Sequence, residues 1–430
     1  PMGLWCGVSF LFPVFILTPL PTARVAWDSG TDQPAFRGDW HPGQSGPVEA
    51  DVTSAGQQDL QARLQEILDG FFQGGSFPGA SAAVSLPDGT VIPITVGEAD
   101  TVRHIPLTPT ARMLQGSAGK TYFAALAMQL FDEGKLELDA SVSRYLGRYP
   151  WFHRVPNAAR ITVRQLMTHT SGVMRYEFKE AFTRDLTAQP DKHWEPEELV
   201  AYVLDEPASF PAGEGWEYSD TNFILLGMIL EEITQRPCYA LIQGRLLDPL
   251  GLENTVPSNG RIIPGLIMGY AGPGNPFGGT DPVLLPDGRF VINPQFEWAG
   301  GGFASTAEDL ARWARALYTG QAFNPELLPV MLDGVPARLG PGSRYGLGVI
   351  LTETEAGPAQ GHSGFFPGYL TEMAYFPNLD VAVALQVNTS VGRALGRAPA
   401  GVVAELALAA GVSESRPSSD QPPRPTRRPS

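Results

Sequence analysis

The sequence predicts a mixed α/β (α+β) fold in which one sheet is built from both ends of the domain, with a mainly helical insertion between them. Two strand–turn–strand patterns lead to this prediction. Residues 80–86 and 91–96 flank a Pro-Asp-Gly turn, and residues 370–376 and 381–387 flank a Pro-Asn-Leu-Asp turn. Apolar runs separated by turn residues are typical of hairpins. Between the two hairpins, apolar residues recur mainly at helical spacing.

The helices are predicted from this spacing. One apolar face opens the domain at residues 60–71, a second follows at 123–131, and a third lies at 222–233. Two more faces, at 310–317 and 400–409, belong to the C-terminal part of the domain. Residues three and four positions apart share a helix face, so each pattern predicts an amphipathic helix.

The composition favours a large packed core. Of the 430 residues, 43% are hydrophobic and 17% are charged, and there are 48 Gly and 40 Pro. An average globular chain has about 25% charged residues, so the sequence is neither mainly disordered nor a coiled coil. The net charge of −15 and the lack of a long basic run before the C-terminal tail argue against nucleic-acid binding.

The N-terminal segment 1–26 has the pattern of a secretory signal peptide. An apolar run at 4–20 is followed by small and polar residues, with a possible cleavage site after Ala26. The run is short for a membrane span and contains two prolines, which argues against a permanent anchor. We therefore expect a periplasmic or secreted protein that contacts a membrane only if this segment stays uncleaved. A buried strand or helix is the alternative interpretation.

The rest of the chain divides by composition into three parts. A polar linker is expected at 27–57, a globular domain at 58–412 and a disordered tail at 413–430. Within the domain, we expect a sheet part formed by about 58–110 and 300–412, and a helical part at about 111–299.

The cysteines and histidines do not suggest a metal site. Cys6 and Cys238 are too few for a disulfide framework, and neither has the spacing of metal ligands. The six His residues include no HExxH motif. We therefore expect no metal and no organic cofactor.

The Ser117-Ala-Gly-Lys120 stretch is the first candidate for chemistry. Positions i and i+3 share a helix face, so the hydroxyl and the amine can meet. A serine needs a neighbouring base to become a nucleophile, and a lysine can serve if burial or nearby positive charge lowers its pKa. Two alternatives are a pair of surface residues and a phosphate loop. The phosphate loop is disfavoured because Leu114 stands where that motif requires Gly.

Tyr218-Ser-Asp220 is the second candidate, because it opens an apolar helix. A tyrosine at a helix start can reach into a cleft and shuttle protons beside a cation. In the alternative interpretation, Tyr218 packs in the core and Asp220 caps the helix through its side chain.

Gly361-His362-Ser363-Gly364 is the third candidate, just before the late hairpin. Small residues let a substrate backbone lie against a strand edge, and a histidine can titrate or donate a hydrogen bond. The alternative is a glycine-rich turn with a surface histidine. The chain has no GxSxG elbow, which argues against an α/β-hydrolase triad.

These three motifs, in this order and at this spacing, resemble those of the serine β-lactamase and penicillin-binding superfamily. The pattern is most similar to class C β-lactamases, DD-peptidases, and related esterases and D-aminopeptidases. The resemblance covers about Asp59 to Val412 and implies a β-lactamase/transpeptidase-like fold with an antiparallel sheet flanked by helices. Further stretches that match this family are Leu166–Gly172, Asp248–Thr255, Ala299–Leu310 and Tyr345–Gly348.

The resemblance implies roles for the catalytic residues. Ser117 would be the acylated nucleophile, Lys120 its activating partner, and Tyr218 would complete the proton-transfer network. Which of Lys120 and Tyr218 acts as the base is left open. The backbone N–H groups of Ser117 and Phe365 would form the oxyanion hole.

The remaining motif residues would bind substrate or support the site. By the same resemblance, His362, Ser363 and Gly364 would line the cleft and contact the carboxylate or acyl side of the substrate. His169, in His-Thr-Ser-Gly, is expected to be structural, because polar residues at helix ends usually cap or pack.

Two positions depart from the family pattern. Class C β-lactamases usually carry Lys-Thr-Gly where this chain has His362-Ser363-Gly364, so β-lactam hydrolysis is disfavoured. The second motif usually ends in Asn, but here it ends in Asp220, which when ionised only accepts hydrogen bonds. Asp220 could instead pair with Lys120 or bind a substrate amine.

The sequence thus predicts a serine hydrolase that acts through an acyl-enzyme on a small ester, a D-amino-acid amide or a cell-wall peptide. A DD-peptidase-like or esterase-like activity is favoured, and a class C-like β-lactamase is the alternative. A catalytically silent protein that binds penicillin or a peptide is the alternative from another class. The expected partner is a small-molecule or peptide acyl substrate, and the oligomeric state is left open.

Overall fold

The computed structural model describes residues 50–273, 275, 277 and 281–411. The predicted signal-like segment 1–26, the predicted tail 413–430 and most of the predicted linker lie outside the described residues. The first helix, α1 (Ala50–Gln73), begins inside that linker, so the linker prediction is wrong over residues 50–57. No proline interrupts these residues, and the helix therefore extends beyond the apolar face on which it was predicted.

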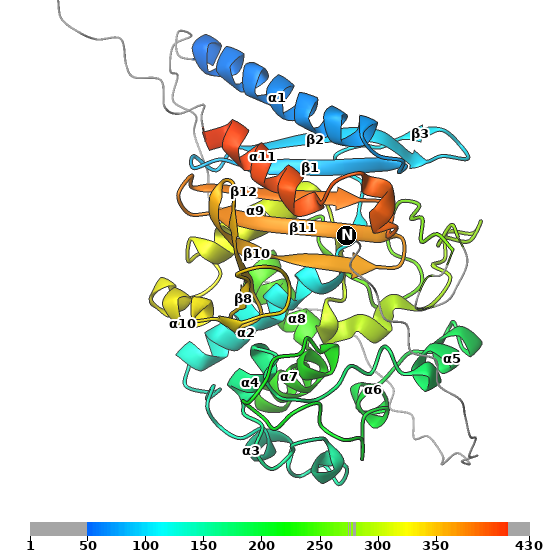
Figure 1. Ribbon diagram of the computed structural model, residues 1–430, viewed down its shortest axis with the longest axis vertical. Coiled ribbons are helices and arrows are strands. Elements are labelled where there is room, and N and C mark those ends of the chain that lie inside the picture. The colour runs from blue at the N-terminus through cyan, green and yellow to red at the C-terminus, as the bar shows by residue number, and fades with distance from the viewer. Residues whose placement is uncertain (1–49, 274, 276, 278–280, 412–430) are drawn as a thin grey trace, which may run out of the picture. The chain divides into compact units, whose positions relative to one another are not determined.

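A nine-stranded antiparallel sheet is the centre of the described part of the chain (Figure 1). In spatial order its strands are β3 (Ile105–Pro106), β2 (Val91–Asp100), β1 (Gly79–Ser85), β12 (Val381–Val387), β11 (Tyr369–Phe376), β10 (Gly357–Phe366), β9 (Ile350–Thr354), β8 (Arg344–Tyr345) and β7 (Val335–Pro336). In the middle of the sheet, β1 pairs with β12, with Ala80 opposite Val387. This pairing confirms that one sheet is built from both ends of the domain.

Both predicted hairpins form, as β1–β2 and β11–β12. The His-Ser-Gly stretch is not a turn but lies within β10, so the alternative interpretation of a glycine-rich turn is wrong. A second, small sheet has the order β4 (Met113–Leu114), β6 (Phe303–Ser305) and β5 (Val256–Pro257).

The sheet separates two hydrophobic cores. Helices α1 and α11 (Pro399–Gly411) cover one face, where their apolar side chains pack on Ala80, Ala82 and Val84 of β1. Helix α9 (Ala307–Tyr318) packs against the other face, to which Ala83 points. Because successive side chains of a strand point to opposite faces, the buried run of β1 serves both cores.

The helical insertion packs below the second face of the sheet (Figure 1). Its α-helices are α2 (Lys120–Asp132), α3 (Ser143–Leu146), α4 (Val163–Met167), α5 (Glu180–Ala188), α6 (Pro196–Ala201), α7 (Asp220–Thr234) and α8 (Cys238–Ile242). A short helix α10 (Leu328–Leu332) follows α9. The helices predicted at 123–131 and 222–233 are α2 and α7, so the helical insertion is confirmed.

Within the described part of the chain, one stretch is long and apolar enough to cross a membrane, Gly392–Gly411. It contains α11, whose apolar residues Val402, Val403 and Leu406 are buried in the core on the sheet. The packing of α11 explains its apolar composition without a membrane.

Two close backbone approaches hold the start of α2 in place. The 3-10 turn η1 (Gly116–Gly119), which precedes α2, lies directly against β10. A Cβ atom on Gly364 of β10 would lie 1.9 Å from the Gln115 carbonyl oxygen. On the other side, a Cβ atom on Gly301 would lie 2.2 Å from the Gly116 carbonyl oxygen. Glycine at both positions therefore allows β10 and the 300–302 loop to enclose the turn.

Gly364→Ala is expected to destabilise the protein, because the added methyl group can fit only if η1 and β10 move apart. We expect the free energy of unfolding to fall by about 1–3 kcal/mol, as in overpacked cores, measured by urea denaturation. Gly260→Ala is the control, since a Cβ atom there meets nothing within 4 Å. Equal stability of the two variants would contradict the close approach.

Candidate active site

Ser117 lies in η1, the turn that leads directly into α2. Lys120 is the first residue of α2, and its Nζ donates to Ser117 Oγ at 3.1 Å. The i, i+3 spacing thus brings the hydroxyl and the amine together, as the sequence predicts. Ser117 is partly exposed, whereas Lys120 is fully buried, so the pair connects solvent to the interior.

The Lys120 ammonium has two further acceptors, from distant parts of the chain. One is the carboxylate of Asp220 at the start of α7, and the other is the carbonyl of Gly300, at the end of η4 (Pro294–Gly300). Ser219, not Asp220, is the N-cap of α7, and no side chain makes a capping bond. The alternative interpretation of Asp220 as a helix cap is therefore wrong. Of the two other roles considered for Asp220, the structure shows the ion pair with Lys120.

Arg175 joins this cluster from the loop after α4. One of its guanidinium nitrogens donates to Asp220 Oδ2 at 3.0 Å, and another donates to Glu177 Oε1. The guanidinium also lies over the ring of Phe178, 4.2 Å from its centroid, and over the ring of Tyr218 at 5.2 Å. Asp220 thus binds a cation through each of its oxygen atoms.

The carboxyl groups of the cluster differ in charge state. Burial alone would raise the pKa of Asp220, but the charges of Lys120 and Arg175 and a hydrogen bond with Glu177 hold that pKa well below its usual range. Burial and the Asp220 charge raise the pKa of Glu177 well above its usual range. Glu177 is therefore held in its neutral form beside the ionised Asp220.

Glu297 is a third buried carboxyl at the site, carried by η4. Its neighbour Trp298 has φ 35°, a strained backbone conformation for a residue other than glycine. Burial raises the pKa of Glu297 to about 8, with the Asp220 charge adding to this and the Lys120 charge opposing it. Within the described residues, Glu297 makes no hydrogen bond or ion pair, and its Oε2 is fully enclosed. Glu297 is thus a neutral acid without a partner at pH 7.

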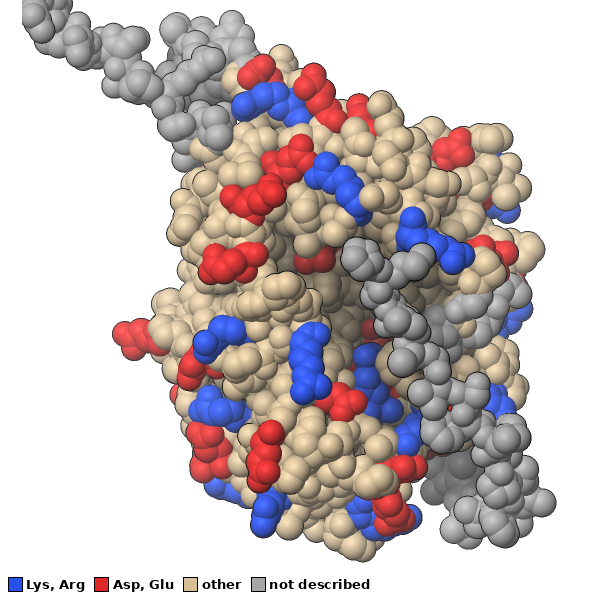
Figure 2. Space-filling view, viewed as in Figure 1, with Lys and Arg blue, Asp and Glu red and all other residues tan. Residues whose placement is uncertain are grey.

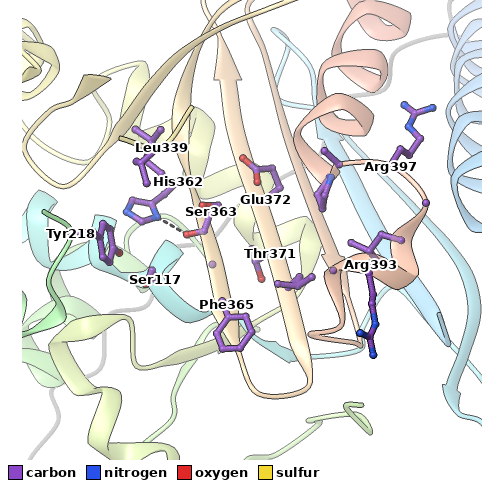
Figure 3. Close-up of a pocket in the computed structure, with 18 of the residues that line it drawn as sticks. Ser117, Tyr218, Leu339, His362, Ser363, Phe365, Thr371, Glu372, Arg393 and Arg397 are labelled. Carbon is purple, nitrogen blue, oxygen red and sulfur yellow. Dashed lines mark hydrogen bonds between the residues drawn. The ribbon is translucent and has the colours of Figure 1, made fainter. Parts of the chain in front are cut away.

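Tyr218 lies on the loop that enters α7, with its ring 5.0 Å from Lys120 Nζ. Its hydroxyl is buried and forms no hydrogen bond of normal geometry with the described residues. Burial and the Asp220 charge raise the pKa of Tyr218 well above its usual range, while its interaction with the Ser117 hydroxyl lowers it. Figure 3 shows Tyr218 beside Ser117 at one end of the pocket.

His169 packs against the ring of Tyr218. Its ring is fully buried and lies 4.2 Å from that of Tyr218, between ring centroids. His169 Nδ1 accepts from the Ser219 backbone N–H at 3.3 Å and lies 3.2 Å from Asn222 Nδ2. Burial and the Lys120 charge lower its pKa well below the usual value. These contacts fit the structural role expected of His169.

His362 is nearly fully buried at the wall of the groove beside Ser117. It is 2% exposed, its Nδ1 donates to the Ser363 carbonyl at 2.6 Å, and its Nε2 accepts from the Tyr345 hydroxyl at 2.8 Å. Burial and the Lys120 charge lower its pKa to about 3, so the ring is neutral. Both nitrogens are thus occupied by protein groups, and a direct substrate contact would require one of these bonds to break.

The edge of β10 is open beside Ser117. Strand β9 pairs with β10 only as far as Gly361, opposite Ile350. The following residues, including Ser363 and Phe365, are exposed at alternate positions. A Cβ atom on Gly116 would lie 2.7 Å from the Phe365 nitrogen, so the two backbone segments expected to form an oxyanion hole lie in contact.

Two cavities meet at Ser117, Arg175 and Phe365. One is a groove of about 650 Å³, which is also lined by Tyr218 and His362. The other is a pocket of about 70 Å³. Its remaining lining residues are Tyr176, Glu177, Phe178, Asp220, Phe277, Phe296, Glu297 and Phe366. Across the described residues, no group of three His, Cys, Asp or Glu side chains could hold a metal ion.

A model of the Beta-lactamase family matches residues 61–408. The chain belongs to this family. Penicillin-binding protein 4* of Bacillus subtilis is 26% identical over 292 residues, which is 64% of this chain and 60% of that protein. Esterase EstB of Burkholderia gladioli is 26% identical over 357 residues, which is 77% of this chain and 91% of that protein.

A solved structure, that of D-amino acid amidase from Ochrobactrum anthropi SV3 complexed with D-phenylalanine, is similar in fold. Its TM-score is 0.70 at 27% identity, over 83% of this chain and 100% of that chain. This likeness confirms the predicted fold class. Together these Beta-lactamase family relatives place the chain in a serine hydrolase superfamily that includes penicillin-binding proteins, esterases and amidases.

Three members of the site were not predicted from the sequence. Arg175 and Glu177 follow the Leu166–Gly172 stretch of the family pattern, and Glu297 precedes the Ala299–Leu310 stretch. The only feature of the sequence that could have identified these residues is their position next to a matched motif. A charged residue in a loop is usually solvated, so nothing in the sequence marks these three as buried.

Glu297→Gln should change how stability depends on pH. The folded state keeps a proton on Glu297 up to about pH 8, whereas the unfolded chain releases it near its ordinary pKa of 4.5. The wild-type free energy of unfolding therefore loses a contribution as the pH rises through this window. We expect the stability of Glu297→Gln relative to wild type to rise by about 3–4 kcal/mol between about pH 5 and pH 8.

Urea denaturation at several pH values measures this difference. Glu326→Gln, which alters an exposed side chain, is the control and should keep the wild-type pH dependence. If the profile of Glu297→Gln runs parallel to that of the wild type, Glu297 is not a buried neutral acid.

Proposed function

We propose that the chain is a serine hydrolase that acts through an acyl-enzyme, with Ser117 as the nucleophile. The observation that carries this proposal is the 3.1 Å contact between Ser117 Oγ and Lys120 Nζ at the junction of two cavities. A serine that is bonded to a buried lysine and open to solvent has the arrangement of an activated nucleophile. Family membership adds independent support, since its relatives include an esterase and an amidase.

The residues of the site perform both half-reactions. Ser117 Oγ forms a bond to the substrate carbonyl carbon, and its proton passes to whichever of Lys120 and Tyr218 has first given up its own proton, as the neutral amine or the phenolate. The backbone N–H groups of Ser117 and Phe365 stabilise the negative oxygen of the intermediate. The bond to the leaving group then breaks, and the leaving group takes that proton. Water repeats the sequence on the ester, which frees the acid and restores Ser117.

His362 and Asp220 act indirectly in this mechanism. His362 bonds the Ser363 carbonyl and the Tyr345 hydroxyl, so it positions the β10 edge. Asp220 binds Lys120 and Arg175, so it positions the lysine beneath Ser117. We infer this positioning role in addition to the substrate contacts that the family resemblance implies for both residues, which line the two cavities.

The small pocket favours an acyl group with an apolar side chain and a free amine. Five phenylalanines line the pocket, so its lining suits an apolar side chain. Glu297 borders the same pocket without a partner, and an ammonium group would supply one. The substrate class is therefore an amide or ester of an amino acid. The amidase relative is named for D-amino acids, which favours the D configuration.

The other activities considered have weaker support. Esterase EstB and penicillin-binding protein 4* are each 26% identical, so ester or peptide cleavage fits the same machinery. The chain spans 60% of the length of penicillin-binding protein 4*. A β-lactamase activity stays disfavoured, because His362 stands where the class C pattern has a lysine.

Ser117→Ala should abolish acyl-enzyme formation. Incubation of the wild type with a reactive ester of D-phenylalanine should add the mass of the acyl group to the protein, and the variant should show no adduct in intact-mass spectrometry. The control Ser141→Ala changes a half-buried serine whose hydroxyl bonds only to its neighbour Ser143. An adduct that survives in Ser117→Ala would identify another nucleophile.

Glu297→Gln should weaken recognition of the substrate amine. A charge-assisted hydrogen bond contributes about 1.5–3 kcal/mol, so kcat/KM for D-phenylalanine amide should fall by about 10- to 100-fold. The rate with 3-phenylpropionamide, which lacks the amine, should stay within about threefold of the wild-type rate. Equal losses on both amides would mean that Glu297 only supports the structure.

A further inference from the structure

Arg175 lies where the two cavities meet, although no step of the proposed mechanism involves it. Its side chain lines both the groove and the small pocket, as do Ser117 and Phe365. It comes from the loop between α4 and α5 and is 29% exposed. Its positive charge is therefore close to the place where a substrate meets the nucleophile, and water screens that charge only in part.

Protein groups hold the guanidinium of Arg175 in place. Its Nη2 donates to Asp220 Oδ2 at 3.0 Å, and its Nε donates to Glu177 Oε1. The guanidinium also lies over two aromatic rings, 4.2 Å from the centroid of Phe178 and 5.2 Å from that of Tyr218. These contacts fix the position of the charge relative to the site.

Asp220 brings a negative charge close to the nucleophile. Lys120 Nζ contacts both Ser117 Oγ and an oxygen of Asp220, so two hydrogen bonds separate the carboxylate from the reacting oxygen. The family pattern usually has a neutral Asn at this position. Negative charge develops on the substrate oxygen during acylation, and a nearby carboxylate opposes this development. A further positive charge beside Asp220 would offset that cost.

Among the described residues around Ser117, few groups can supply this positive charge. Besides Asp220, the titratable groups near the serine are Lys120, His169, Arg175, Glu177, Tyr218, Glu297, Tyr345 and His362. Burial holds the two histidines and the two glutamates in their neutral forms. Lys120 is the cation that the family pattern already includes. Arg175 is therefore the added cation that matches the added carboxylate.

Tyr218, which lies beside Ser117 in Figure 3, responds to both charges. Burial and the Asp220 charge raise the pKa of Tyr218, whereas the Arg175 charge lowers it. Asp220 and Arg175 thus act in opposite directions on negative charge at the same place.

Charges on the surface do not replace this pair. Among the residues drawn in colour, Figure 2 shows basic and acidic side chains interspersed over this face, without a large patch of either sign. Exposed charges are also screened by salt over about 8–10 Å. The buried and half-buried groups therefore dominate the electric field at Ser117.

We propose that Arg175 is a positioning residue matched to Asp220: it holds the carboxylate and offsets its charge, so that negative charge can develop beside Ser117 during acylation. This inference rests on the proposed function and deepens it, because it explains how the site works with a carboxylate in its second motif. Arg175 acts through Asp220 and makes no covalent bond in the reaction.

A double-mutant cycle tests the proposal, with stopped-flow measurement of acylation by a reactive ester of D-phenylalanine. Arg175→Gln should lower the acylation rate by about 10- to 100-fold, the effect of one unit charge a few ångströms away in a partly buried site. Added to Asp220→Asn, the same substitution should raise the rate by about tenfold, because it removes one of the two cations that Asp220→Asn leaves unbalanced. An equal loss in both backgrounds would overturn the proposal, since Arg175 would then act independently of Asp220.

Arg175→Lys keeps the positive charge without the planar guanidinium, so it tests the charge directly. Its acylation rate should stay within about tenfold of the wild-type rate, and a larger loss would overturn the proposal. This comparison decides the question even if Arg175→Gln does not fold. Arg154→Gln is the matched control, because it removes an arginine from an exposed pair with Asp205 and should keep the wild-type rate.

Intact-mass spectrometry separates this inference from the proposed function. If the wild type forms an adduct that requires Ser117, and Arg175→Gln has the same effect in both backgrounds, only the inference fails. If the adduct survives in Ser117→Ala, the proposed function fails and the inference fails with it.

Discussion

The buried ammonium group of Lys120 is the constraint on which the site depends. An isolated charge in the interior costs several kcal/mol, so it persists only with close partners. Its acceptors, Ser117 Oγ, the Asp220 carboxylate and the Gly300 carbonyl, come from η1, α7 and η4. Asp220 and Gly300 lie 100 and 180 residues after Lys120 in the sequence. Satisfying one charge therefore requires distant parts of the chain to be assembled together. The nucleophile is thus positioned by the fold as a whole.

The Lys120 charge also influences the charge states of the carboxyl groups around it. Asp220 balances Lys120 and Arg175, and Glu177 stays protonated because it is buried and because a second carboxylate beside Asp220 would be repelled. Glu297, which lacks any cation partner, is left neutral at the wall of the acyl pocket. The Lys120–Asp220 ion pair therefore positions the lysine beneath Ser117 and also influences the charge states of the carboxyl groups that line the small pocket. The open β10 edge and the groove beyond it complete the path to solvent.

Local sequence patterns predicted the parts of the site that depend on short-range geometry. Ser117 and Lys120 are three residues apart on one helical turn, so their contact follows from backbone spacing alone, and the hairpins follow from turn residues. The sequence left the partner of Asp220 undecided between Lys120 and a substrate amine. The choice depends on a contact between two residues that are 100 positions apart. Arg175, Glu177 and Glu297 were missed for the same reason. Their burial is created by packing between distant segments.

The rate of Ser117 acylation in Asp220→Asn tests the central claim most directly. Stopped-flow measurement with a reactive ester of D-phenylalanine, on protein shown to be folded by circular dichroism, isolates the first half-reaction. If the ion pair positions Lys120, the acylation rate should fall about a hundredfold or more, since asparagine leaves two buried cations without a counter-charge. Asp205→Asn, an exposed pair with Arg154, is the control. An unchanged acylation rate in folded Asp220→Asn would contradict the account.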